Sequence, residues 1–123
     1  MELQQPFLKL PWCFDAAQLA KEVEALPTNY WLDHPSGLAG NTAVPLVSVD
    51  GAMNHAFDGA MKPTEALLNS SYLHQVVASF GEVVARSRLM RLAPGAKVAE
   101  HVDFNYHWVS RVRIHVPIIT NPA

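Results

Sequence analysis

The sequence has few charged residues and only one cysteine, and both scarcities narrow the class of protein. Charged side chains make up 16% of the 123 residues, and the formal net charge is −2. Without an excess of positive charge, neither nucleic acid nor an anionic membrane is expected as a partner. The single cysteine, Cys13, excludes an internal disulfide and fits a reducing compartment. Because it lies between Trp12 and Phe14, we expect its thiol to be buried.

Long apolar runs are also missing. No stretch reaches the length of a membrane span, and the first residues lack the basic and apolar regions of a secretory signal. We therefore expect a cytoplasmic protein. Half of the residues are hydrophobic, which allows a core in a single domain over residues 1–123. The low charge leaves apolar surface, so association with a second copy is expected.

Helical patterns occupy the first part of the chain. Asp15 is a good N-cap, and apolar residues recur at helical spacing over 16–26, up to Pro27. A second helix is predicted over 72–80, where Gly81 would end it. Either Thr64 or Ser71 could cap a short helix in this part of the chain.

Two short strands are predicted among these helices, over 7–10 and 44–49. The turn dipeptide Asp50-Gly51 follows the second strand. We expect loops over 30–42 and 52–63, and we assign no role to the histidines within them.

Strand patterns begin at residue 83. Segments 83–92, 97–104 and 111–120 are predicted as strands, with a Pro-Gly turn after the first. A helix-rich part over 1–82 followed by strands over 83–123 is the order typical of an α+β fold.

His101 and Asp103 share one face of their predicted strand, because side chains alternate along a strand. An imidazole and a carboxylate two positions apart can bind one divalent metal. They would supply two ligands of the facial triad that suits non-haem Fe(II). The spacing alone is a weak signal, since a surface His–Asp hydrogen bond gives the same pattern.

The strand predicted over 111–120 has two different faces. A surface strand would expose its charged face to water, but Pro117 and Ile119 continue that face. The interior of a barrel with a polar pocket fits this pattern better, and Arg113 and His115 would bind a small carboxylate there. The charged face holds Arg111, Arg113 and His115, and the other holds Val112, Ile114, Val116 and Ile118.

Together these motifs resemble the aspartyl/asparaginyl β-hydroxylase family of Fe(II)/2-oxoglutarate dioxygenases. The resemblance is carried by 88–95, by His101-Val102-Asp103 and by 111–122, with looser matches over 44–51 and 64–80. It implies a double-stranded β-helix, a jelly-roll or cupin-like barrel, with the N-terminal helices packed on one side. It also implies hydroxylation of an amino acid or a peptidyl side chain. The implied site residues are His101 and Asp103 as metal ligands, and Arg113 and His115 as 2-oxoglutarate-binding residues.

The family's site also needs a distal histidine and a later arginine, and neither stands before Ala123. His107 would lie about 13 Å from Asp103 on a straight strand, so it would need a turn to become a ligand. His115 is the other local substitute. We therefore expect an incomplete barrel and half a site. Either the sequence is part of a longer gene product, or a second copy covers the open face around Ile114, Val116 and Ile118.

Two other functions fit the same residues. One is a non-catalytic cupin-like domain that acts by association and binds metal weakly or not at all. The other is a cupin-type isomerase or binding protein that holds a different divalent metal through a third local ligand. Iron-dependent formation of succinate from 2-oxoglutarate would distinguish the hydroxylase from both.

Overall fold

One helix precedes three consecutive strands, and two further helices precede the fourth described strand. The structure is a computed structural model that describes residues 9–33, 40–56, 58–81, 85–95 and 113–120. Within these ranges, no helix has the length and apolar character needed to cross a membrane. The elements are α1 (Ala16–Glu24), the 3₁₀ turn η1 (Thr28–Tyr30), β1 (Leu32–Asp33), β2 (Asn41–Val49), β3 (Met61–Pro63), α2 (Glu65–Leu68), α3 (Ser71–Ala78) and β4 (Ser87–Leu92).

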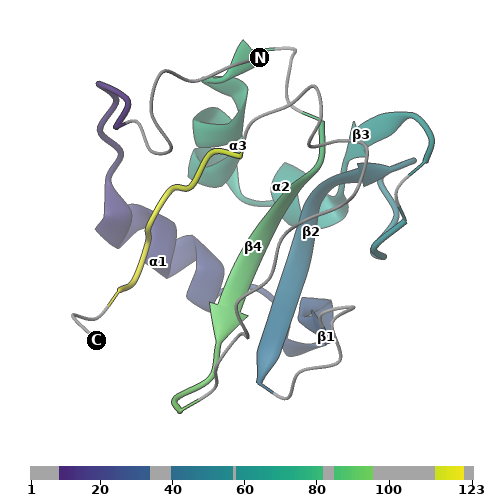
Figure 1. The fold of residues 1–123 in the computed structure, drawn as a ribbon, viewed down its shortest axis with the longest axis horizontal. Helices are drawn as coiled ribbons and strands as arrows, with labels where there is room; N and C mark the ends of the chain where they lie inside the picture. Colours follow the sequence, from purple (N-terminus) through teal and green to yellow (C-terminus); the bar gives the residue numbers. More distant parts are fainter. Residues whose placement is uncertain (1–8, 34–39, 57, 82–84, 96–112, 121–123) are drawn as a thin grey trace.

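β2 is the central strand of an open antiparallel sheet (Figure 1). β4 pairs with one edge of β2, while β1 and β3 pair with the two ends of the other edge. The predicted α+β class is therefore confirmed, and the jelly-roll barrel stays a prediction. The loops predicted over 30–42 and 52–63 are wrong in part, because β1, the start of β2 and β3 lie within them.

Pro45 lies in the middle of this central strand, although proline has no N–H to donate to a neighbouring strand. Prolines inside sheets occur mainly at edges and bulges. The register of β2 against β4 shifts between Pro45 and Val47, so Pro45 lies next to a bulge. Its carbonyl accepts a hydrogen bond of 2.8 Å from Thr64 Oγ1. That hydroxyl also caps α2 by accepting from the N–H of Leu67 at 3.4 Å, so one buried side chain joins the sheet to the helix.

The predicted Asp50-Gly51 turn is present after β2. Asp50 and Gly51 have φ values of 56° and 70°, and the N–H of Ala52 donates to the carbonyl of Val49 at 3.1 Å. Positive φ at both central residues defines a type I′ turn, which asparagine, aspartate and glycine favour. A Cβ on Gly51 would lie 2.7 Å from the Pro63 carbonyl oxygen, so the close approach of β3 also requires glycine.

The core lies between the sheet and the helices. Leu19 of α1, Leu67 of α2 and Val76 of α3 pack against one face of the sheet. Val44 of β2 and Leu89 of β4 are paired across the sheet and meet these helical residues. The apolar stripe predicted for each long helix therefore faces the sheet.

The starts of α1 and α3 are stabilised in different ways. Asp15 caps α1 as predicted, because its Oδ1 accepts from the N–H of Gln18 at 3.1 Å. At α3, Ser70 makes no capping hydrogen bond among the described residues. Instead Glu22 of α1 accepts from the N–H groups of Leu73 at 2.7 Å and Tyr72 at 3.0 Å. The cap of α3 thus comes from a neighbouring helix.

Cys13 is exposed, so the prediction of a buried thiol is wrong. Its aromatic neighbours make the contacts instead. The ring of Trp12 lies 4.9 Å from that of Phe80 between centroids, in an edge-on arrangement, and the ring of Phe14 lies 6.1 Å from it. These rings attach the segment before α1 to the end of α3. The predicted strand over 7–10 is also wrong for residues 9 and 10, which have no regular structure.

Candidate functional site

The residues predicted for the site fall in two segments. His101 and Asp103 lie outside the described residues. Arg113 and His115 are exposed, and residues 113–120 contain no strand, so that part of the strand prediction over 111–120 is wrong.

Val116 and Ile118 nevertheless pack against the core of their own chain, whereas Ile114 and Ile119 are exposed. Burial of the face around Ile114, Val116 and Ile118 by a second copy stays a prediction. Apolar contact holds this segment against the core without strand pairing.

The sheet face turned away from the helices is also covered over part of its area. Side chains alternate along β2, so Ala43 and Pro45 point away from the face that carries Val44. Both are buried, as is Asn41, which is 4% exposed. The central strand is therefore buried on both faces, as is expected of a sheet that lies inside a protein rather than on its surface.

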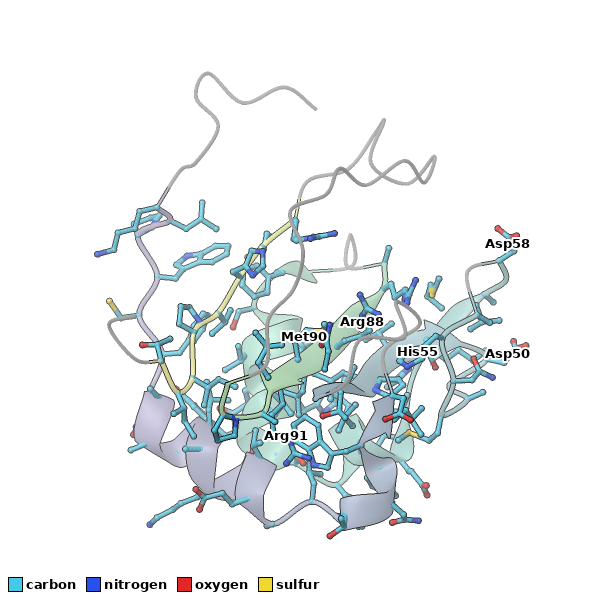
Figure 2. All side chains as sticks on the ribbon, turned by 60° about the horizontal axis from the view of Figure 1, so that its bottom comes forward. Asp50, His55, Asp58, Arg88, Met90 and Arg91 are labelled. Carbon is cyan, nitrogen blue, oxygen red and sulfur yellow. The ribbon has the colours of Figure 1, made fainter. Side chains whose placement is uncertain are left out.

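Three residues that can carry positive charge gather on this second face, and we call them the cationic cluster: His55, Arg86 and Arg88. Arg88 lies opposite Pro45 on β4, and Arg86 just precedes that strand. His55 comes from the segment between β2 and β3, and both of its ring nitrogens are shielded from solvent. Figure 2 shows His55 and Arg88 on the same side of the sheet.

Arg91 lies on the opposite side of β4 from Arg88 (Figure 2). Its guanidinium carbon is 3.9 Å from the centroid of the Trp31 ring, which places a cation over an aromatic face. Arg91 pairs across the sheet with Thr42, which by alternation shares the face of Val44, whereas Arg88 pairs with Pro45. Arg91 therefore belongs to the helix-packed face. Two arginines of one strand thus have different surroundings.

The cationic cluster disfavours additional positive charge. Burial lowers the pKa of His55 below its ordinary value of 6.5, and the charges of Arg88 and then Arg86 lower it further. A hydrogen bond with the backbone of Asp33 acts in the opposite direction. Burial also lowers the pKa of Arg86, although a guanidinium keeps its charge at neutral pH. His55 is therefore neutral near pH 7, and it is within range of the charges of two arginines.

This pKa shift predicts that the protein loses stability in mild acid. The unfolded chain takes up a proton at His55 near pH 6.5, while the folded chain takes it up only at lower pH. The free energy of unfolding should therefore fall as the pH drops through about 6.5, and level off below the folded-state pKa. Urea unfolding at pH 7.5, 6.5 and 5.5 measures this slope. His55→Gln should reduce it, whereas His74→Gln, at an exposed position of α3, should leave it unchanged.

The cluster can attract and orient an anion. Each guanidinium offers parallel N–H donors that match the two oxygens of a carboxylate, and a neutral imidazole can add one further hydrogen bond. A metal is not expected between two arginines. Within the described ranges, no group of three or more His, Cys, Asp and Glu side chains could hold a metal ion.

The sequence contained part of the signal for this cluster. Arg86 and Arg88 are two positions apart at the start of a predicted strand, so alternation could have placed them on one face. His55 gave no such signal, because it lies in a segment without periodicity and reaches the strand only through the turn at Asp50-Gly51.

A hollow of about 180 Å³ lies on the helix side of the molecule, and its lining includes Glu22, Tyr30 and Ser70. The carboxylate of Glu22 already caps α3. Burial, together with the hydrogen bond and charge of Glu65, raises the pKa of Tyr30. These polar groups therefore serve contacts within the chain.

Comparison of the chain with protein-family models, with curated proteins and with solved structures gave no match. The functional argument therefore rests on the residues themselves and on their arrangement.

Proposed function

We propose that this chain carries part of an Fe(II)/2-oxoglutarate-dependent hydroxylase site of the aspartyl/asparaginyl β-hydroxylase type, acting on an amino acid or a peptidyl side chain. The observation that carries the proposal is the order of motifs in the sequence. His101-Val102-Asp103 supplies metal ligands, and Arg113-Ile114-His115 follows with groups that bind carboxylates. Each motif alone is common, and their succession after the 88–95 segment is the distinctive feature.

The donor types suit the proposed metal. Imidazole nitrogen and carboxylate oxygen are the ligands of the Fe(II) facial triad, and His101 and Asp103 would provide one of each. A further imidazole is needed to complete the triad. Iron and 2-oxoglutarate, when bound, supply the oxidising power for hydroxylation of a C–H bond. Arg113 would hold a carboxylate of 2-oxoglutarate in a bidentate manner, and His115 would add a hydrogen bond.

The described architecture supports this proposal in one respect. The helices pack on a single face of an antiparallel sheet, and the opposite face carries buried small residues beside the cationic cluster. A sheet face that is shielded from water over part of its area and bears positive charge is a suitable wall for a site that binds carboxylate substrates.

The test measures metal binding before turnover. Anaerobic calorimetric titration of the chain with Fe(II) should give binding that His101→Ala and Asp103→Ala abolish, while His74→Ala keeps it. Formation of succinate from 2-oxoglutarate in air should then depend on added iron and fall to background in the same two variants. A folded chain that neither binds iron nor forms succinate would count against the proposal.

A second candidate is a non-catalytic domain that acts by association. Met90 and Leu92 of β4 are 51% and 50% exposed, which is unusual for large apolar side chains on neighbouring positions of one strand face. We propose that a second copy covers them. Sedimentation velocity should show a dimer that Met90→Lys converts to a monomer, and a wild-type monomer at micromolar concentration would contradict this proposal.

A further inference from the structure

Residues 113–120 are attached to a core that the earlier part of the chain forms by itself. Within the described ranges, nine buried apolar residues make up that core, and all of them lie between Leu19 of α1 and Leu89 of β4 along the chain. Val116 and Ile118 pack against this cluster from outside and are only half-buried. The sheet and the helices therefore have a core before residue 113 is reached.

Backbone pairing does not hold this segment in place. Residues 113–120 contain no strand, and the backbone hydrogen bonds between described residues leave out 114–120. Figure 1 shows the segment as an extended stretch that passes α1. Segments with few buried apolar contacts and little backbone pairing open locally at a lower free energy than the whole domain.

The first residue of the segment is attached differently from the rest. Arg113 makes an interaction of its own within the chain, whereas residues 114–120 contact the core through Val116 and Ile118. We call residues 114–120 the strap. His115 lies on the strap, is exposed, and follows Arg113 by two positions. Because side chains two positions apart in an extended backbone point to the same side, the docked strap places His115 on the same side as Arg113, about 7 Å further along.

We propose that the strap docks and releases as a unit while the sheet and the helices stay folded, and that docking through Val116 and Ile118 brings His115 beside Arg113. The docked strap assembles the two groups to which carboxylate binding was assigned, and the released strap separates them. That consequence rests on the proposed function, whereas the docking equilibrium itself does not.

A ligand that contacts both residues stabilises the docked strap. Such a ligand binds the docked state more tightly than the released state, so its presence shifts the equilibrium toward docking. 2-Oxoglutarate offers carboxylate oxygens to the guanidinium of Arg113 and to the imidazole of His115. The released fraction should therefore fall when 2-oxoglutarate binds.

The isoleucines provide a selective probe of the strap. The sequence contains three of them, Ile114, Ile118 and Ile119, and all three lie on the strap. Methyl labelling of isoleucine in the full 123-residue chain thus gives NMR signals from the strap alone. Ile118 packs against the core while Ile119 is 71% exposed, so release changes the surroundings of the Ile118 methyl group more. Relaxation dispersion at Ile118 should show exchange between a docked and a released state.

A matched pair of variants tests the anchoring. Val116→Ser removes an apolar contact and keeps the Ile118 probe, so it should raise the released fraction about tenfold. Ile119→Ser makes a comparable replacement at an exposed position of the strap and should leave that fraction unchanged. Far-UV circular dichroism should show folded helices and sheet in both variants. Loss of the folded domain in Val116→Ser, equal effects of the two replacements, or no exchange at Ile118 in wild type and Val116→Ser would overturn the inference.

The ligand experiment separates the strap from the proposed function. Adding 2-oxoglutarate with Zn(II), a diamagnetic substitute for Fe(II), should lower the released fraction several-fold. Exchange at Ile118 without iron binding or succinate formation would support the strap and count against the proposed function. Succinate formation by a chain in which Ile118 shows no exchange would do the reverse. Exchange that 2-oxoglutarate leaves unchanged, in a chain that converts it to succinate, would overturn the link between docking and the site.

Discussion

Leu67→Ala is expected to lower the free energy of unfolding by about 3 kcal/mol, the largest effect that we predict for a single side chain. Leu67 is 1% exposed and belongs to the core that joins α2 to the sheet. Truncation removes buried apolar surface and leaves a cavity, because Thr64 and Val44 around it are held by the sheet and cannot move in to fill the space. Urea unfolding followed by circular dichroism measures the loss.

Leu68 provides a matched control within the same four-residue helix. It is 59% exposed, so Leu68→Ala changes helix propensity and composition in the same way without opening a cavity. We expect a change within about 0.5 kcal/mol for this variant. Equal destabilisation by the two replacements would mean that α2 is not anchored through Leu67.

Glu22→Ala is expected to cost about 2–3 kcal/mol, although Glu22 belongs to no apolar contact that the sequence would flag. Its two carboxylate oxygens accept from the N–H groups of Leu73 and Tyr72, and the Ser71 hydroxyl is 3.4 Å from one of them. The negative charge also lies at the positive end of α3. Removing it leaves the first backbone N–H groups of α3 without their acceptor and removes the hydrogen bonds that join α1 to α3.

Two further variants separate these contributions. Glu24→Ala removes the same charge from an exposed position of the same helix and should change stability by less than about 0.5 kcal/mol. Glu22→Gln keeps an acceptor oxygen but loses the charge, so its loss should be intermediate. Thermal or urea unfolding at neutral pH gives all three values, and a Glu22→Ala variant as stable as Glu24→Ala would refute the capping role.

Features that depend on neighbouring residues were predictable from the sequence. The Asp15 cap and the Asp50-Gly51 turn involve contacts within a few positions, and both are present. The helices over 16–26 and 72–80 followed from apolar periodicity and differ from α1 and α3 only at their ends. The α+β class followed from the order of these patterns.

Features that depend on distant residues were not predictable in this way. β1 has two residues and β3 has three, so neither is long enough to show the alternation of apolar and polar residues that predicts a strand. Each is a strand because it pairs with β2. Glu22 caps a helix some fifty positions away. The site shows the same limit, because Arg88 could be placed by strand alternation while His55 reaches it only through the fold of the β2–β3 connection.

The central place of β2 also sets an order of assembly. β3 follows β2 after one turn and a loop, so pairing of these two strands closes only a short loop. The entropy cost of that closure is small, and the pairing can form once both strands have been synthesised. The partner on the other edge, β4, comes only after β3, α2 and α3. During synthesis from the N-terminus, the edge of β2 that pairs with β4 therefore stays unpaired until α2, α3 and β4 have been synthesised. Arg88 lies on β4, the last strand among the described residues, so it is synthesised after His55 and after the three strands that precede β4.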